Sequence, residues 1–185
     1  MCEGVVGEQT PAFRDAIEIA VIDPSAPYAS GIQAALPNAL IAVDKWHLVA
    51  LANQMVTEQQ RVTRDLLGHR GTVADAVWLN RRVLLAGADH LPAKQWRRLE
   101  AMLDHCDPIQ EIGAALGVKE RLRLLLTEQG PSEIWRRLAD FYDATLDAAM
   151  PETTRPAQTV RTWWPAILVA LTTTCPTLAQ KGSTG

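Results

Sequence analysis

Apolar residues form two short runs near the beginning of the chain, at residues 17–22 and 40–43, and an aspartate follows each run directly. Both runs are rich in Ile, Val, Leu and Ala and are bounded by turn-forming residues, a pattern that predicts buried β-strands. Between them, apolar residues recur at helical spacing from Tyr28 to Leu36, and Pro37 ends this pattern. A strand, a helix and a strand in this order predict a βαβ unit with parallel strands and a right-handed crossover.

The hydrophobic pattern becomes helical after residue 47 and stays helical to Leu171. Proline and glycine interrupt it at Pro92, at Pro108, at residues 130–131 and at Pro151, so a succession of helices is expected. The positions that we expect to face the core are Leu48, Leu51, Ala52, Met55, residues 59–62, Trp78, residues 83–85, Trp96, Leu99, Met102, Leu103, Cys106, Leu122, Leu125, Leu126, Ile134, Leu138 and Phe141. The sequence therefore predicts an α/β beginning followed by a long, mostly α-helical region.

The composition is that of a globular protein and gives no overall sign of nucleic-acid binding. The hydrophobic fraction is 48%, and 18 Lys and Arg residues stand against 21 Asp and Glu residues, for a net charge of −3. Any contact with DNA therefore needs a local basic face. The pairs at residues 81–82, 97–98 and 136–137, all Arg-Arg, are candidates for such a face, although a solvated helix surface is the commoner role of such pairs.

The cysteines and the apolar runs bear on the compartment. Cys2, Cys106 and Cys175 are odd in number and far apart, so we expect a reducing cytoplasm and no metal framework built on cysteine. No apolar run approaches ~18 residues, so no membrane span is expected. The first residues show neither the basic region nor the apolar core of a signal peptide.

Asp23 and Asp44 are the first candidates for chemistry, because each follows the carboxyl end of a predicted parallel strand. Ligands of open α/β sheets gather outside these strand ends, and carboxylates there suit a hard cation such as Mg²⁺. A plainer alternative is that each aspartate caps the helix that follows it. His47 lies one helical turn after Asp44, where it is either a structural hydrogen-bond partner or a metal ligand.

A longer pattern surrounds these residues. It consists of a strand, Asp23, a turn, Tyr28, a helix, residues 36–39 (Leu-Pro-Asn-Ala), a second strand, and residues 44–49 (Asp-Lys-Trp-His-Leu-Val). This pattern resembles that of the transposases of the ISL-three family of bacterial insertion sequences. The resemblance continues through the segments QRVTRDLLGHRG, WLNRRVLLAG, VKERLRLLL and TVRTWWPAI, and so covers residues 13–167.

The resemblance implies an RNase H-like core with three acidic residues, the DDE set, which performs phosphoryl transfer on DNA with two metal ions. The implied cofactor is Mg²⁺, and the implied partner is the DNA at the ends of the insertion sequence. Asp23 matches the second Asp of the set and is the expected catalytic and metal-binding residue. Asp44 and His47 match an accompanying motif that is expected to support the site, and the helices after His47 match the insertion between the second Asp and the Glu.

Two parts of the family pattern have no counterpart in the sequence, namely the strand with the first Asp and the motif with the catalytic Glu. We therefore expect a partial RNase H-like core at residues 1–47, a helical insertion at residues 48–171 and a tail at residues 172–185, in a chain that is a transposase fragment and is catalytically dead by itself. The alternative function is a helical interaction or inhibitor module that binds a full-length transposase. An unrelated helical domain is the third hypothesis.

The tail suggests a shifted reading frame. If the third base of each codon from Thr174 onward is read with the first two bases of the next codon, the bases can encode Val-Ser-Asn-Ala-Arg-Thr-Glu-Gly-Phe-Asn, which fits the missing Glu motif. Residues 172–185 are then expected to be out of frame and disordered, with Cys175 an exposed thiol. The nucleotide sequence tests this, because the frame that begins at the third base of the Leu171 codon must encode Ser-Asn-x-x-Thr-Glu-Gly.

Overall fold

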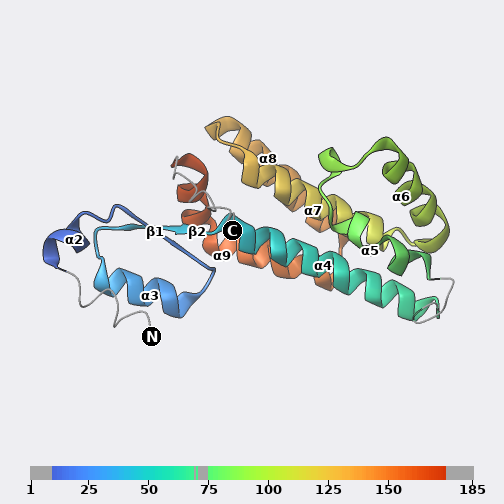
Figure 1. Ribbon diagram of the computed structural model, residues 1–185, viewed down its shortest axis with the longest axis horizontal. Coiled ribbons are helices and arrows are strands. Elements are labelled where there is room, and N and C mark those ends of the chain that lie inside the picture. Colours follow the sequence, from blue (N-terminus) through green and yellow to red (C-terminus); the bar gives the residue numbers. More distant parts are fainter. Residues whose placement is uncertain (1–9, 69, 71–74, 174–185) are drawn as a thin grey trace, which may run out of the picture. The chain divides into compact units, whose positions relative to one another are not determined.

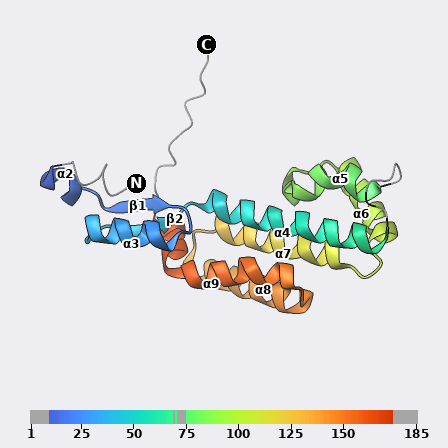
Figure 2. The same ribbon diagram turned by 90° about the horizontal axis from the view of Figure 1, so that it is seen from below.

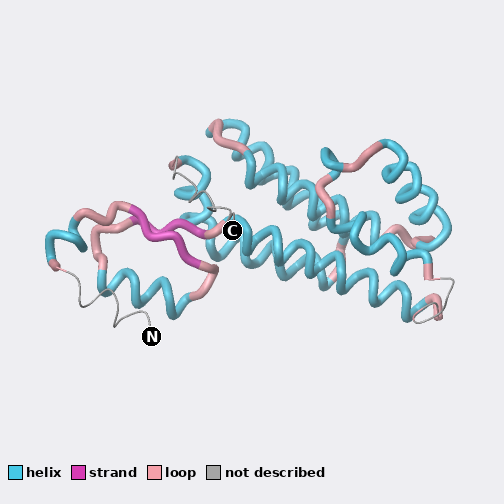
Figure 3. Tube along the Cα trace, in the orientation of Figure 1, coloured by secondary structure: helices cyan, strands magenta, loops and turns pink. Residues whose placement is uncertain are grey.

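The structure is a computed structural model that describes residues 10–68, 70 and 75–173. It is mostly helical, with two short strands near the beginning of the chain (Figures 1 and 3). The elements in chain order are α2 (Pro11–Asp15), β1 (Ile19–Ile22), α3 (Ala26–Ala35), β2 (Leu40–Val43), α4 (Lys45–Leu66), α5 (Ala76–Leu85), the short 3₁₀-helix η1 (Ala88–His90), α6 (Ala93–Cys106), α7 (Glu111–Thr127), α8 (Pro131–Ala148) and α9 (Pro151–Thr172).

Strands β1 and β2 form a two-stranded parallel sheet, and helix α3 connects them. The register pairs Ile19, the first residue of β1, with Leu40, the first residue of β2. The strand was predicted over residues 17–22, so β1 begins two residues later than predicted. Helix α3 ends just before Leu36, whose backbone leaves the helical region, as expected for the residue before Pro37. The parallel βαβ unit is therefore confirmed, whereas the larger RNase H-like core stays a prediction.

The contacts divide the chain into two compact units. Residues 1–44 and 163–185 form the first unit, in which the structure describes residues 10–44 and 163–173, and residues 45–162 form the second. Helix α9 contributes to both units. The functional boundaries expected after residues 47 and 171 stay predictions, and residues 174–185 of the expected tail, including Cys175, lie outside the described residues.

The second unit has its core between α4, α7 and α8, with α5 packed on α4 and α6 packed on α5. Figure 2 shows α4 lying alongside α7 over much of its length. A mainly apolar set of fully buried side chains fills this core, and the set includes Leu48, Val56, Leu84, Leu99, Ile112, Leu122, Leu125, Ile134 and Phe141. Most of these positions belong to the stripes that the sequence pattern indicates.

Proline marks the helix boundaries at the expected places. Pro92 is the N-cap of α6, and Pro131 and Pro151 are the first residues of α8 and α9. A proline is tolerated there because the first N–H groups of a helix have no partner within the helix. Pro108 lies in the connection between α6 and α7.

Three apolar positions that were expected in the core are exposed. The Trp78 side chain is 49% exposed, that of Val62 is 39% exposed and that of Trp96 is 38% exposed. The Trp78 ring instead contacts two guanidinium groups, since Arg81 lies 3.9 Å and Arg64 lies 5.0 Å from the ring centroid. Cations are attracted to the face of an indole ring, so this surface position is stabilised without burial in the core.

Candidate metal centre

Asp23 and Asp44 lie just after the carboxyl ends of β1 and β2, at the same edge of the sheet. Ile22 pairs with Val43 in the parallel register, and the N–H of Asp44 donates a hydrogen bond to the carbonyl oxygen of Ile22 over 2.9 Å. The ladder therefore continues one residue beyond β2, and Asp23 and Asp44 are the next residues along the two strands. This confirms the expectation that the two carboxylates share one sheet edge.

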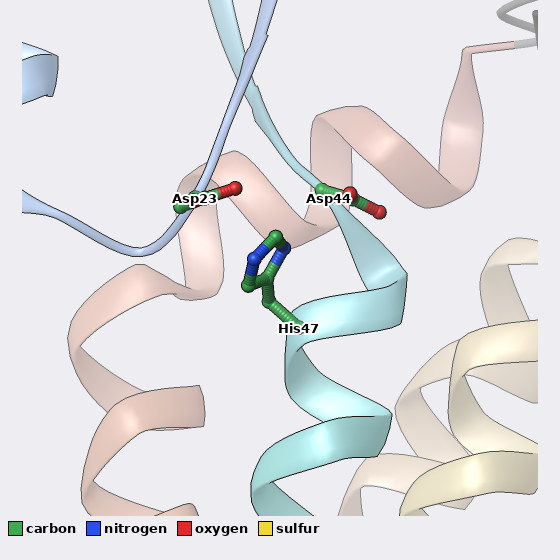
Figure 4. Close-up of side chains that lie close together, drawn as sticks. All are labelled: Asp23, Asp44 and His47. Carbon is green, nitrogen blue, oxygen red and sulfur yellow. The ribbon is translucent and has the colours of Figure 1, made fainter.

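His47 lies in the first turn of α4, three residues after Asp44. Figure 4 shows its ring directed toward the ends of the two strands, with Asp23 and Asp44 on either side. One carboxylate oxygen of each aspartate and one ring nitrogen lie within 4.8 Å of one another. Asp23 is exposed, whereas Asp44 and His47 are half-buried. Among the His, Cys, Asp and Glu residues that the structure describes, these three form the group whose spacing suits a metal ion.

The donor set fits a divalent cation. Ligand atoms held about 2.1 Å from an octahedral ion lie about 3 to 4 Å apart, so these three groups, whose ligand atoms lie within 4.8 Å of one another, are close to the spacing that one ion requires. The oxygens of Asp23 and Asp44 suit Mg²⁺, and the imidazole nitrogen of His47 extends the fit to transition metals. The residues present therefore fit the cation that the resemblance implies.

The helix-capping alternative holds for one aspartate at most. The N-cap of α3 is Ser25 and not Asp23, so that alternative is wrong for Asp23. Asp44 directly precedes Lys45, the first residue of α4, which is the position that capping requires. A carboxylate has two oxygens, so a capping role and a metal-binding role are compatible at Asp44.

The neighbours of His47 restrain its ring. The Trp46 ring meets the His47 ring edge to face, with centroids 5.1 Å apart and an interplanar angle of 86°. Trp46 itself is 68% exposed. Burial lowers the pKa of Lys45, the basic residue that follows Asp44 in the chain. The exposed Trp46 ring therefore lies directly beside the imidazole of the candidate site.

Sequence reasoning located all three residues of this group, but it separated their roles. Asp23 was the expected metal-binding residue, and Asp44 and His47 were expected to support it. The structure brings the three side chains together without distinguishing a ligand from a supporting residue. The individual roles therefore stay predictions.

A comparison with protein-family models identifies the class of protein. The model of the ISL-three DDE transposases, described as transposase, matches residues 4–179. The chain therefore belongs to this transposase family, and the match includes Asp23, Asp44 and His47. No curated protein and no solved structure matches the chain significantly. Within the described residues, every helix is too short or too polar to cross a membrane.

Proposed function

We propose that this chain contributes a metal-binding acid to a transposase that cuts and joins DNA at the ends of an insertion sequence. The supporting observation is the pair of strand-end carboxylates, Asp23 and Asp44, in a chain of the transposase family. Divalent metal ions held by carboxylates activate the attacking hydroxyl group and stabilise the leaving oxygen in phosphoryl transfer. Because the substrate is bacterial DNA, the proposed place of action is the cytoplasm.

The burial of the three side chains supports different roles. Asp23 is exposed, so a cation on its carboxylate stays accessible to a DNA phosphate. Asp44 and His47 are half-buried at the start of α4, where the helix restrains both residues. We assign Asp23 as the catalytic metal ligand, and Asp44 and His47 as positioning residues that fix the ligand geometry.

The chain alone is proposed to be inactive. A two-metal mechanism stabilises both the attacking and the leaving oxygen, and each ion needs carboxylate ligands of its own. Within the described residues, the strand ends bring together only the carboxylates of Asp23 and Asp44, in one candidate metal group. We therefore propose that this chain acts only together with the other acids of the catalytic set.

A metal titration tests the site. Mn²⁺ binding to the full chain is measured by calorimetry, and Asp23→Asn is expected to weaken it at least tenfold, with smaller losses for Asp44→Asn and His47→Gln. Asp143→Asn, at an exposed position of α8, makes the same change of charge and should leave the affinity unchanged. Equal losses at Asp23 and Asp44 would contradict the assigned roles, and a wild-type chain that binds no Mn²⁺ would overturn the site.

An activity assay tests the reaction. The chain is incubated with insertion-end DNA and Mg²⁺, alone and together with a family transposase whose own second Asp has been changed to Asn. We expect nicking only in the mixture, and we expect Asp23→Asn in this chain to abolish it. Nicking by this chain alone would contradict the proposed inactivity, and a mixture that stays inactive would remove the support for the role of Asp23.

A further inference from the structure

The segment from Ala76 to Leu99, which contains α5, η1 and the first half of α6, is basic within an acidic chain. It has five Arg and Lys residues and one acidic residue, Asp89, whereas the whole chain has a net charge of −3. The Asp89 carboxylate is paired with Arg123 of α7 over 3.1 Å. Helices α5 and α6 pack together, as Figures 1 and 2 show. This part of the second unit therefore has a local excess of positive charge.

Three of these bases lie on one side of α6. Arg97 and Arg98 lie three and four residues after Lys94, so the three side chains are neighbours on the surface of the helix. All three side chains are exposed, whereas the side of the helix that contains Leu99 and Cys106 is buried. We call the exposed stripe formed by Lys94, Arg97 and Arg98 the α6 basic face.

The bases of the α6 basic face form no close ion pair. Like charges at these spacings destabilise a helix, and within the described residues no carboxylate lies at ion-pair distance from the three bases, although the exposed Glu100 follows Arg97 by three residues. The arginine pair of α8 is different. Arg136 pairs with Glu133 over 2.6 Å, and Arg137 pairs with Glu128 over 3.2 Å. The arginine pair of α8 is therefore held in close ion pairs, whereas that of α6 is not.

We propose that the α6 basic face binds the phosphate backbone of duplex DNA, an inference that rests on the proposed transposase function. Charge complementarity selects this partner, because Lys and Arg side chains neutralise phosphates and release the counterions condensed on the duplex. A guanidinium group also matches two phosphate oxygens at once. Such contacts position a protein on DNA without reading its sequence. The second unit thereby holds the substrate with groups that are separate from the metal ligands.

The test compares two triple variants of the full chain. Lys94→Gln/Arg97→Gln/Arg98→Gln removes the α6 basic face and keeps residues of similar helix propensity. The control, which removes three other arginines of the same unit, is Arg121→Gln/Arg136→Gln/Arg137→Gln. Both variants change the net charge equally, and circular dichroism checks that both fold. Fluorescence anisotropy then measures binding to a short duplex of arbitrary sequence at several salt concentrations.

The α6 variant is expected to bind DNA at least tenfold more weakly at low salt. The slope of its log affinity against log salt concentration should be less negative than that of the wild type by about 2 to 3. The control should stay close to the wild type. Equal losses in both variants would overturn the proposal, because net charge would then explain binding, and a wild-type chain that does not bind the duplex at low salt would also overturn it.

The outcome is separable from that of the proposed function. If Asp23→Asn leaves Mn²⁺ binding and nicking unchanged while the α6 variant loses DNA binding, the proposed catalytic role fails and the α6 basic face stands. If the two triple variants bind DNA alike while Asp23→Asn abolishes Mn²⁺ binding, the proposed function stands and the inference about α6 fails.

Discussion

The hydrogen bond from the N–H of Asp44 to the carbonyl oxygen of Ile22, 2.9 Å long, sets the register at the end of the two-stranded sheet. A slip of one residue in a β-ladder moves every side chain of a strand to the other face. Asp44 would then no longer share a side of the sheet with Asp23. The candidate metal centre therefore depends on the forces that hold β2 in this register.

Burial of β2 is one such force, and Val43 tests it. The Val43 side chain is 1% exposed, whereas that of Val21, on β1, is 56% exposed. Val43→Ala should lower the free energy of unfolding by about 1 to 2 kcal/mol, because two buried methyl groups are lost. Val21→Ala should change it by less than about 0.5 kcal/mol. Urea denaturation followed by circular dichroism measures both, and losses of equal size would show that burial of β2 does not hold the register.

A second prediction concerns the start of α5. Asp75 is 3% exposed, its carboxylate accepts a hydrogen bond from the N–H of Trp78 over 2.9 Å, and it pairs with the guanidinium of Arg64. Asp75→Ala should destabilise the protein by about 3 kcal/mol, because it removes a helix cap and leaves Arg64 as an uncompensated, mostly buried charge.

The matched control for Asp75 is Asp65. Its ion pair with Arg70 joins side chains that are 48% and 53% exposed. Asp65→Ala should therefore cost less than about 1 kcal/mol, since exposed ion pairs contribute little. Denaturation curves of the two variants at one salt concentration make the comparison. Similar losses would mean that the burial of the Arg64–Asp75 pair does not determine its contribution.

The sequence indicates those parts of the structure that follow from local chemistry. The strand at residues 40–43 has the predicted bounds, because its apolar run is short and flanked by turn-forming residues. Pro131 and Pro151 begin helices, because proline is best tolerated in the first turn, although α9 also contains Pro156 and Pro165 in its interior. The error at Trp78 has a physical reason too, since periodicity treats an indole ring as apolar and ignores its attraction to Arg64 and Arg81.

Other features depend on residues far apart in the sequence, and no local pattern indicates them. The Lys119 ammonium is buried and donates hydrogen bonds to the carbonyl oxygens of Leu84, over 2.8 Å, and Ala86, over 2.6 Å. It thereby satisfies carbonyl groups at the end of α5 from a position 35 residues after Leu84. In the sequence, Lys119 and Glu120 are an ordinary charged pair within a helical stripe. Only the packing of α7 near α5 gives Lys119 this role.

Glu120 completes the same network. Its carboxylate lies 3.0 Å from the Lys119 ammonium and accepts hydrogen bonds from the Arg123 guanidinium, over 2.9 Å, and from the N–H of Ala88, over 3.2 Å. Burial favours the neutral form of Glu120, but Lys119, Arg123 and Ala88 together outweigh it, so the pKa of Glu120 is lowered from its ordinary value of 4.5. Burial also lowers the pKa of Lys119, although the Glu120 carboxylate opposes this shift.

The lowered pKa of Glu120 predicts an acid-sensitive contribution to stability. Below about pH 4.5 the unfolded chain binds a proton at Glu120 more readily than the folded chain, so the free energy of unfolding must fall as the pH decreases through the folded-state pKa. Glu120→Gln should lower stability at pH 7 by about 2 kcal/mol, because hydrogen bonds to a charged group are lost. The same variant should lose less stability than the wild type between about pH 5 and pH 3, since it has no carboxylate to protonate there.

Glu100→Gln, at an exposed position of α6, removes a carboxylate outside the network and should follow the wild-type pH dependence. Urea denaturation of the three proteins at several pH values measures these slopes, and a Glu120→Gln curve parallel to the wild type would show that the Lys119–Glu120–Arg123 network does not hold this carboxylate in its charged form.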